Sequence, residues 1–103
     1  MTKVTVSKNL GGEIIKLSAT GHAEYAALGY DIVCAATSAI IQTACLGLTK
    51  FDCCEIKKSD GNIYIKVCAP TTQNQLILNT MMLGLHDLQT QYPKYIKIKE
   101  ETK

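Results

Sequence analysis

The sequence predicts an α+β fold, a two-layer sandwich in which two helices pack on one sheet. Hydrophobic residues alternate with polar ones in several short segments, as in half-buried strands, whereas two longer segments follow a helical spacing. The segments are ordered strand, strand, helix, then the same again, and a final strand. This near-duplication is typical of two helices that cover one shared sheet, although the order of strands within the sheet does not follow from it.

The N-terminal part of the chain predicts a β-hairpin. Residues 2–8 alternate between apolar and polar side chains, and residues 13–20 alternate again with Ile15, Leu17 and Ala19 on one face. The residues between these segments include two glycines, which are common in turns. We therefore expect an antiparallel pair that ends just before the first histidine of the chain.

A long helix is expected at residues 32–49, which are rich in alanine, isoleucine and leucine. Asp31 is placed to be its N-cap, since an aspartate side chain can accept from the unpaired N–H groups of the first turn. We expect the helix to pack on the sheet through small side chains that permit a close approach. The residues of this face are Ala36, Ala39, Ile40, Thr43, Ala44, Gly47 and Leu48.

The second half of the chain predicts another hairpin and a final strand. Residues 51–58 and 62–69 flank Asp60 and Gly61, and an Asp-Gly pair is a strong signal for a tight turn. Residues 94–99 alternate as the last strand. The inward-facing residues expected in the second strand of this hairpin are Ile63, Ile65 and Val67.

A second helix is expected at residues 73–90, opened by a capping box of Thr72 and Gln75. Its apolar residues recur at helical spacing. The stripe consists of Leu78, Met81, Met82, Leu85 and Leu88. Leu76, Ile77 and Leu83 extend the apolar surface beyond this stripe, which predicts either a buried helix or a homodimer contact.

Length and composition limit the classes to which the protein can belong. A chain of 103 residues has room for one domain, here residues 1–103, and 47% apolar with 19% charged residues is ordinary for a globular protein. The net charge of +2 is spread along the chain, so we expect no direct binding of nucleic acid. No apolar run looks long and uninterrupted enough to span a membrane, so no membrane partner is expected.

Cysteine usage predicts a reducing compartment. The chain has an odd number of cysteines, no CxxC spacing and no signal peptide, so a cytoplasmic location is expected. Adjacent cysteines in a strand point to opposite faces, which argues against joint metal binding by Cys53 and Cys54, and we expect neither a metal nor another cofactor. The cysteines are Cys34, Cys45, Cys53, Cys54 and Cys68.

The stretch from Gly21 to Ala39 carries the chemistry-bearing residues. A thiolate is a strong nucleophile but a free thiol ionises only near about pH 8.5, so a reactive cysteine needs a helix N-terminus or an imidazolium beside it. Cys34 is expected in the first helical turn, and His22 could reach it if the intervening loop folds back. Asp31 would then orient His22. Each of these residues also has an ordinary structural interpretation, since a cysteine in an apolar helix is usually a small buried side chain.

The run from Gly21 to Ser38, GHA followed by GYDIVCAATS, resembles the signature of the ribosomal-processing cysteine protease family Prp, and length and element order also fit. The resemblance implies that His22 and Cys34 form a catalytic dyad, with Asp31 and Ser38 as supporting residues. It further implies an endopeptidase that removes a short N-terminal extension from large-subunit ribosomal protein number twenty-seven during ribosome assembly. The first-turn N–H groups, including that of Cys34, would stabilise the oxyanion.

Three further expectations concern alternatives. Residues 23–30, with Gly21 just before them and Gly29 as the hinge within them, could form a lid over the substrate or an ordinary loop. A noncatalytic ribosome-associated binding module, in which Cys34 is structural, is the competing function. A thiol redox sensor would need a resolving cysteine, and Cys45 is three helical turns from Cys34, too far to bridge without distortion.

Overall fold

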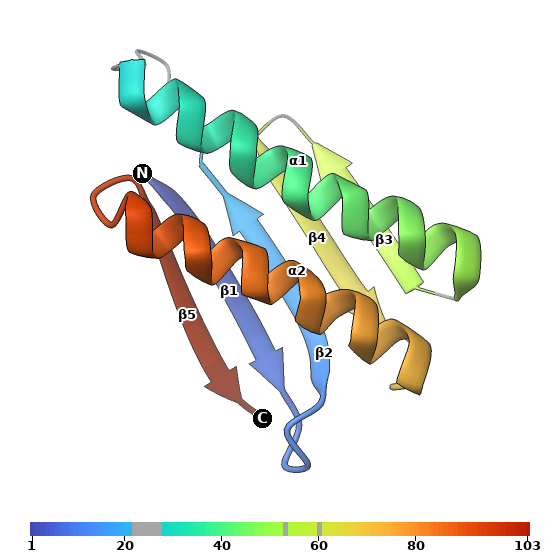
Figure 1. The fold of residues 1–103 in the computed structure, drawn as a ribbon. Coiled ribbons are helices and arrows are strands. Elements are labelled where there is room, and N and C mark those ends of the chain that lie inside the picture. Colours follow the sequence, from blue (N-terminus) through green and yellow to red (C-terminus); the bar gives the residue numbers. More distant parts are fainter. Residues whose placement is uncertain (22–27, 53, 60) are drawn as a thin grey trace.

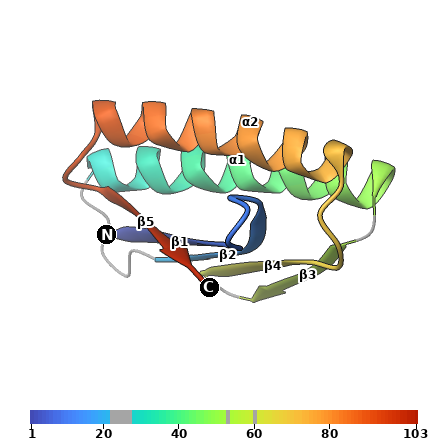
Figure 2. The same ribbon diagram turned by 90° about the horizontal axis from the view of Figure 1, so that it is seen from below.

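The chain forms two layers, a sheet and two helices that lie side by side on one of its faces (Figures 1 and 2). The computed structural model describes residues 1–21, 28–52, 54–59 and 61–103, with the backbone alone for 28–31. This arrangement confirms the predicted α+β sandwich. In chain order the elements are β1 (Thr2–Lys8), β2 (Ile14–Thr20), α1 (Leu28–Phe51), β3 (Cys54–Ser59), β4 (Asn62–Val67), α2 (Thr72–Gln91) and β5 (Ile96–Thr102).

The sheet has the strand order β3-β4-β2-β1-β5, in which β1 and β5 are parallel and the other neighbours antiparallel. The alternating directions bring the C-terminal ends of β2 and β3 and the N-terminal ends of β1 and β4 to the same end of the sheet (Figure 1). The register aligns these ends, because Thr20 pairs with both Lys3 and Asn62, and Asn62 pairs with Ser59. Four strands therefore contribute residues to this end of the sheet, below α1.

The core lies between the sheet and the helices. Val4, Val6 and Leu17 of the sheet are fully buried, as are Ile41 of α1 and Leu85 of α2. Burial of side chains of this size stabilises a fold by about 1.5–3 kcal/mol each. All five residues of the apolar stripe predicted for α2 are buried.

One inward position of the first hairpin differs from the expectation. Ile14, not Ile15, is buried at 1% exposure, while Ile15 is half-buried. The pairing of β1 with β2 shifts between Ser7 and Lys8, so the alternation of β2 is interrupted after its first residue. A bulge of this kind moves a single side chain to the other face of the sheet, and periodicity alone does not reveal it.

Helix α1 begins earlier than predicted. Its first residue is Leu28, so Asp31 lies inside the helix and is not the N-cap, and Gly29 lies in the first turn instead of in a loop. The side chain of Asp31 lies outside the part of the structure that is described.

The buried face of α1 also differs from the one predicted. Val33, Thr37 and Ile41 face the core together with Ala44 and Leu48 of the predicted face, whereas Ala39 and Thr43 of that face are exposed. A Cβ at Gly47 would lie 3.6 Å from Ile77, so the small residues serve the close approach of the two helices. The prediction of this face was therefore correct for Ala44 and Leu48 and wrong for Ala39 and Thr43. Helix α1 has two packing partners, and spacing alone does not say which stripe meets which.

Residues Ile32–Phe51 of α1 are long and apolar enough to cross a membrane by length and composition, contrary to the expectation that no segment qualifies. In the fold this segment packs against the sheet through fully buried residues such as Val33, Ile41 and Leu48. A helix with both a sheet and another helix as neighbours is apolar on more than one side. Packing on these two sides accounts for part of its apolar composition, while Ile32, Leu46 and Phe51 of the same segment are exposed.

Helix α2 starts with a capping box that lies one residue earlier than predicted. Thr71 is the N-cap and Asn74, not Gln75, completes the box. The backbone N–H of Asn74 donates to Oγ1 of Thr71, and the backbone N–H of Thr71 donates to Oδ1 of Asn74, both at 3.0 Å. Asn74 is fully buried and also donates to the carbonyl of Ala69, which ties the helix start to the segment that follows β4.

Candidate active site

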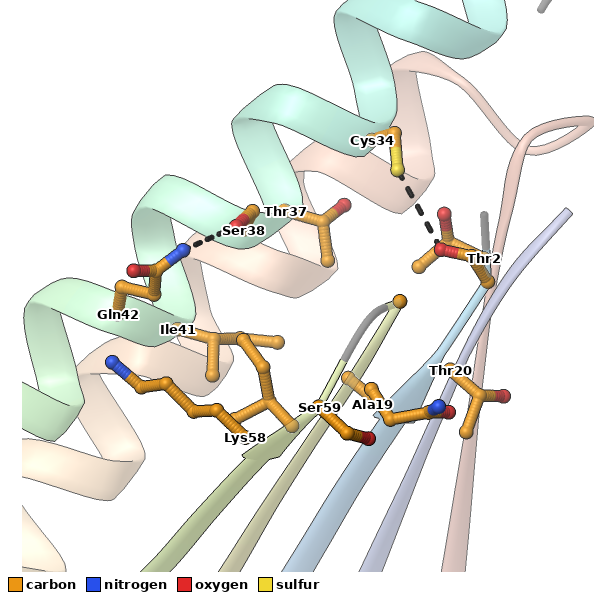
Figure 3. A pocket seen from close by; sticks show the side chains of 14 residues that line it. Thr2, Ala19, Thr20, Cys34, Thr37, Ser38, Ile41, Gln42, Lys58 and Ser59 are labelled. Atoms are coloured by element: carbon orange, nitrogen blue, oxygen red, sulfur yellow. Dashed lines mark hydrogen bonds between the residues drawn. The ribbon is translucent and has the colours of Figure 1, made fainter. Parts of the chain in front are cut away.

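A pocket of about 250 Å³ opens between α1 and the end of the sheet at which four strands begin or end. It contains Cys34, on the helix side of the pocket (Figure 3). Its other walls come from the ends of β2 and β3 and the starts of β1 and β4. The residues that line it include Thr2, Gly21, Cys34, Ser38, Gln42 and Lys58.

Helix α1 determines the orientation of Cys34. The neighbouring Val33 and Thr37 are 0% and 2% exposed and anchor this part of the helix against the sheet. The Oγ1 of Thr37 donates to the carbonyl of Val33 at 2.8 Å, so its hydroxyl is satisfied within the helix. Cys34 therefore points toward the pocket and is half-buried, which leaves its sulfur accessible to a ligand there.

The sulfur of Cys34 contacts the backbone of Gly21. The thiol donates a hydrogen bond to the carbonyl oxygen of Gly21, with 3.7 Å between sulfur and oxygen (Figure 3). The backbone N–H of Gly21 donates in turn to the carbonyl of Gly61 at 3.1 Å. Cys34 and Gly61, which are distant from each other in sequence, thus both bond to Gly21 and hold it, at the end of β2, beneath the start of α1.

Gly21 cannot be replaced without strain. Its φ is +144°, and a Cβ at this position would lie 2.8 Å from Cα of Thr2 and 2.9 Å from the carbonyl oxygen of Met1. A residue with a side chain meets both a disfavoured backbone conformation and two backbone atoms. The positive φ and the close backbone contacts therefore explain why the residue before His22 is a glycine.

The position of Cys34 in α1 changes the expected role of the helix. Cys34 lies about one and a half turns after Leu28, so its N–H is not among the unpaired groups of the first turn. The favourable field of a helix N-terminus falls off within that turn. The expectations that the helix start activates the thiol and that the Cys34 N–H binds an oxyanion were wrong, since α1 begins at Leu28.

The other predicted site residues fall into two groups. Ser38 lies one turn after Cys34 in the same pocket and accepts a hydrogen bond from Nε2 of Gln42 at 2.6 Å. His22 and the predicted lid up to residue 27 lie outside the described residues. Gly29, the predicted hinge, is part of α1. The structure thus brings together Gly21, Cys34 and Ser38.

Sequence reasoning missed several residues of the pocket. Thr37, Ile41 and Gln42 follow Cys34 at helical spacing, and that spacing would have predicted them. Lys58 and Asn62 come from the second hairpin, and only the strand order places them here. Lys58 is the one charged side chain among the described residues that line the pocket.

No metal site is formed by the described residues: among them, no three His, Cys, Asp or Glu side chains lie close enough to hold an ion. The prediction about Cys53 and Cys54 falls partly on Cys53, which lies outside the described residues.

Cys45 differs from Cys34 in its surroundings. It is 2% exposed, and burial raises the pKa of its thiol, while the positive charge of Lys58 lowers it to a smaller extent. The two cysteines are about 16 Å apart along the helix axis by helix geometry, whereas disulfide-linked Cα atoms are at most about 7 Å apart. Within α1, Cys34 is thus the cysteine suited to attack a ligand in the pocket.

Comparisons with known proteins agree on one family. The family model described as cysteine protease Prp matches residues 1–97. A ribosomal processing cysteine protease Prp from Staphylococcus aureus is 31% identical over 104 residues, covering 95% of this chain and 97% of its own. A protein of the same description from Mycoplasma pneumoniae is 33% identical over 107 residues, with 100% and 98% coverage.

Solved structures give the same answer. The crystal structure of an essential ribosomal processing protease Prp from S. aureus, in complex with a substrate peptide, is 26% identical and covers 98% of this chain and 100% of that one, with a TM-score of 0.91. A structure of the S. aureus protein with a covalently linked product peptide has a TM-score of 0.87 at 27% identity, with the same coverage.

Proposed function

The chain belongs to the cysteine protease Prp family and is a cysteine peptidase, and we propose that it removes the N-terminal extension of large-subunit ribosomal protein number twenty-seven with a dyad of Cys34 and His22. The observation that carries this proposal is the half-buried thiol of Cys34 in a pocket that also contains Gly21. The names of the relatives support ribosomal processing as the role.

Chain connectivity supports His22 as the partner of the thiol. The carbonyl of Gly21 that accepts the Cys34 hydrogen bond belongs to the peptide group that joins Gly21 to His22. The backbone nitrogen of His22 is therefore bonded to a carbonyl carbon whose oxygen lies 3.7 Å from the sulfur. Because Cys34 lies beyond the first turn of α1, the helix N-terminus does not favour the thiolate. A neighbouring imidazole is the other group that can take the thiol proton.

The proposed reaction follows the acyl-enzyme route. His22 takes the proton that the thiol shares with the Gly21 carbonyl in the resting site, and the thiolate sulfur attacks the peptide carbonyl carbon. The imidazolium then protonates the leaving amine as the C–N bond breaks. Water, deprotonated by the same imidazole, hydrolyses the thioester and restores the thiol. Asp31 is proposed to orient His22, and Ser38 to act as a polar neighbour of the sulfur.

The shape of the pocket supports a peptide as substrate. Its floor is formed by the ends of four strands and one wall by α1, and we expect an extended chain to fit between them. Polar groups of Ser38, Gln42 and Asn62 line it together with the charge of Lys58. Such a mixture suits the alternation of amide groups and side chains in a peptide.

Mass spectrometry of the ribosomal protein after incubation with this protein tests the proposal directly. We expect loss of the N-terminal extension with the wild type, and a rate lower by about a thousandfold or more with Cys34→Ala or His22→Ala, because each removes one half of the dyad. Cys45→Ala is the matched control in the same helix, and its folded fraction should cleave at a rate near that of the wild type.

Two outcomes would contradict the proposal. Cleavage by a correctly folded Cys34→Ala protein would show that another group is the nucleophile. Binding of the ribosomal protein without any cleavage by the wild type would favour the noncatalytic binding module instead.

We also propose a second copy of this chain as a partner. A groove of about 690 Å³ lies between α1 and α2, and its lining residues, among them Ile40, Phe51, Leu76 and Ile77, include no charged side chain. Phe51 and Leu76 are 63% and 67% exposed. A second copy presents the same uncharged face, so pairing would cover apolar surface without burying a charge.

The cytoplasm is the location that we propose for this activity. A thiol nucleophile must be reduced, and the described Cys34 and Cys45 are both free thiols.

A further inference from the structure

The hydroxyl of Thr2 is buried at the Cys34 pocket without a hydrogen-bond partner. Thr2 is 4% exposed and lines the pocket. Among the described residues, its Oγ1 is the one buried side-chain nitrogen or oxygen atom for which no partner is found. Buried hydroxyls are almost always paired, because leaving one unpaired destabilises the fold. An unpaired hydroxyl in a pocket wall therefore indicates a ligand that completes it.

Gly21 links Thr2 to the sulfur of Cys34. The backbone of Gly21 approaches Thr2 so closely that a Cβ there would lie 2.8 Å from Cα of Thr2, and its carbonyl accepts the Cys34 hydrogen bond. Figure 3 shows the Thr2 side chain at the same end of the pocket as the sulfur. Gly21 thus packs against Thr2, whose hydroxyl is unpaired, and also bonds to the sulfur of Cys34.

Strand pairing holds Thr2 in this place. Its backbone N–H donates to the carbonyl of Tyr95 at 2.9 Å, and Thr2 pairs with Ile96 at the start of the parallel β1–β5 ladder. Gly21 packs on its Cα from the other side. The backbone of Thr2 is therefore held in place, and a ligand that meets its side chain does not have to order this part of the chain.

We propose that the hydroxyl of Thr2 positions the substrate by donating a hydrogen bond to a main-chain carbonyl of the peptide beside the bond that Cys34 attacks. This inference rests on the proposed peptidase function of the same site. A main-chain carbonyl is available in every peptide, and it supplies the acceptor that the folded protein alone does not. Thr2 acts by orienting the peptide and takes no part in bond making.

Peptide affinity tests this role apart from catalysis. The probe is a fluorescent peptide that spans the proposed cleavage junction of the ribosomal protein, and the host is the Cys34→Ala protein, which binds without turnover. In this host, we expect Thr2→Val to raise the Kd about two- to tenfold, because one neutral hydrogen bond is lost. Thr2→Ser retains the hydroxyl and should keep the Kd within about twofold of the parent value.

Two further measurements separate positioning from a structural role. Thr2→Val should raise the Tm or leave it unchanged, because it removes an unpaired buried hydroxyl while preserving the shape of the side chain. A structural residue would instead lower both affinity and Tm. Thr5→Val is the matched control, since Thr5 lies on the same strand but does not line the pocket, and its Kd should equal that of the parent.

The outcomes distinguish this inference from the proposed function. An unchanged Kd in Thr2→Val, or an equal loss in Thr2→Ser, would overturn the role of the hydroxyl even if the wild type cleaves the peptide. A wild type that fails to cleave, together with the expected Kd pattern in the variants, would overturn the peptidase proposal and retain the role of Thr2. Absence of any peptide binding in the parent would overturn the inference.

Discussion

The carbonyl oxygen of Gly21 lies 3.7 Å from the sulfur of Cys34 and accepts its hydrogen bond, although thirteen positions separate the two residues in the chain. This contact joins the end of β2 to α1 and forms one end of the pocket. The next residue after Gly21 is His22, which we propose as the base for the same cysteine. The contact depends on a glycine, because a side chain at position 21 would meet the backbone of Thr2 and Met1.

Gly21→Ala should lower both stability and activity. The positive φ alone costs about 1–3 kcal/mol for a residue with a side chain, and the close contacts with Thr2 and Met1 add to this cost. We also expect movement of the Gly21 backbone to displace the proposed base, His22, and a shift of about 1 Å at a catalytic group lowers the rate by about a hundredfold. Urea unfolding and kcat/KM for the junction peptide measure the two effects.

Gly12→Ala is the control for backbone strain. Gly12 also has a positive φ, +83°, but a Cβ there meets no atom within 4 Å. We expect it to cost about 1–2 kcal/mol of stability and to leave kcat/KM unchanged. Equal activities of the two variants would show that the Gly21 contact with Cys34 is irrelevant to the reaction.

Alkylation should distinguish an activated thiol from an ordinary one. With limiting iodoacetamide at mildly acidic pH, we expect Cys34 to react faster than Cys68, although Cys68 is exposed and Cys34 only half-buried. A neighbouring imidazole would increase the thiolate fraction of Cys34, and the thiolate is the reacting form. Peptide mapping by mass spectrometry gives the order, and an order that simply follows exposure would favour the binding module.

Cys45 should make stability depend on alkaline pH. Burial raises the pKa of its thiol, so the folded state holds the proton more tightly than the unfolded state. Its contribution is complete below the unfolded pKa, about 8.5, and is lost as the pH rises from there through the raised pKa of the folded state. Denaturant unfolding at several pH values should show a steeper alkaline decline for the wild type than for Cys45→Ala; parallel curves would disprove the assignment.

The proposed pairing of two copies predicts an effect of charge in the groove between α1 and α2. Leu76→Glu places a carboxylate on the groove and should shift the protein from dimer to monomer in analytical ultracentrifugation, because pairing would bury that charge. Leu10→Glu is the control, since Leu10 is 91% exposed in the turn between β1 and β2 and does not line the groove. A wild type that is monomeric at high concentration would end this proposal.

Much of the fold follows from local patterns that the sequence displays. The alternation in β1 and the stripe of α2 around Leu78 and Leu85 predicted buried residues correctly, because solvent and core impose a period of two on a strand and of 3.6 on a helix. Element boundaries were less accurate. Helix α1 begins at Leu28 through residues that carry no strong start signal, which removed Cys34 from the first turn.

The sequence by itself determined the order of elements, the glycine before His22 and the cysteine at position 34, because local propensity and chemical identity are written in single residues and their spacing. Only the tertiary structure decided which residues surround that cysteine. Thr2 and Lys58 reach the pocket through the strand order β3-β4-β2-β1-β5 and its register. Pairing between distant strands depends on how the whole core packs, so no local pattern specifies it.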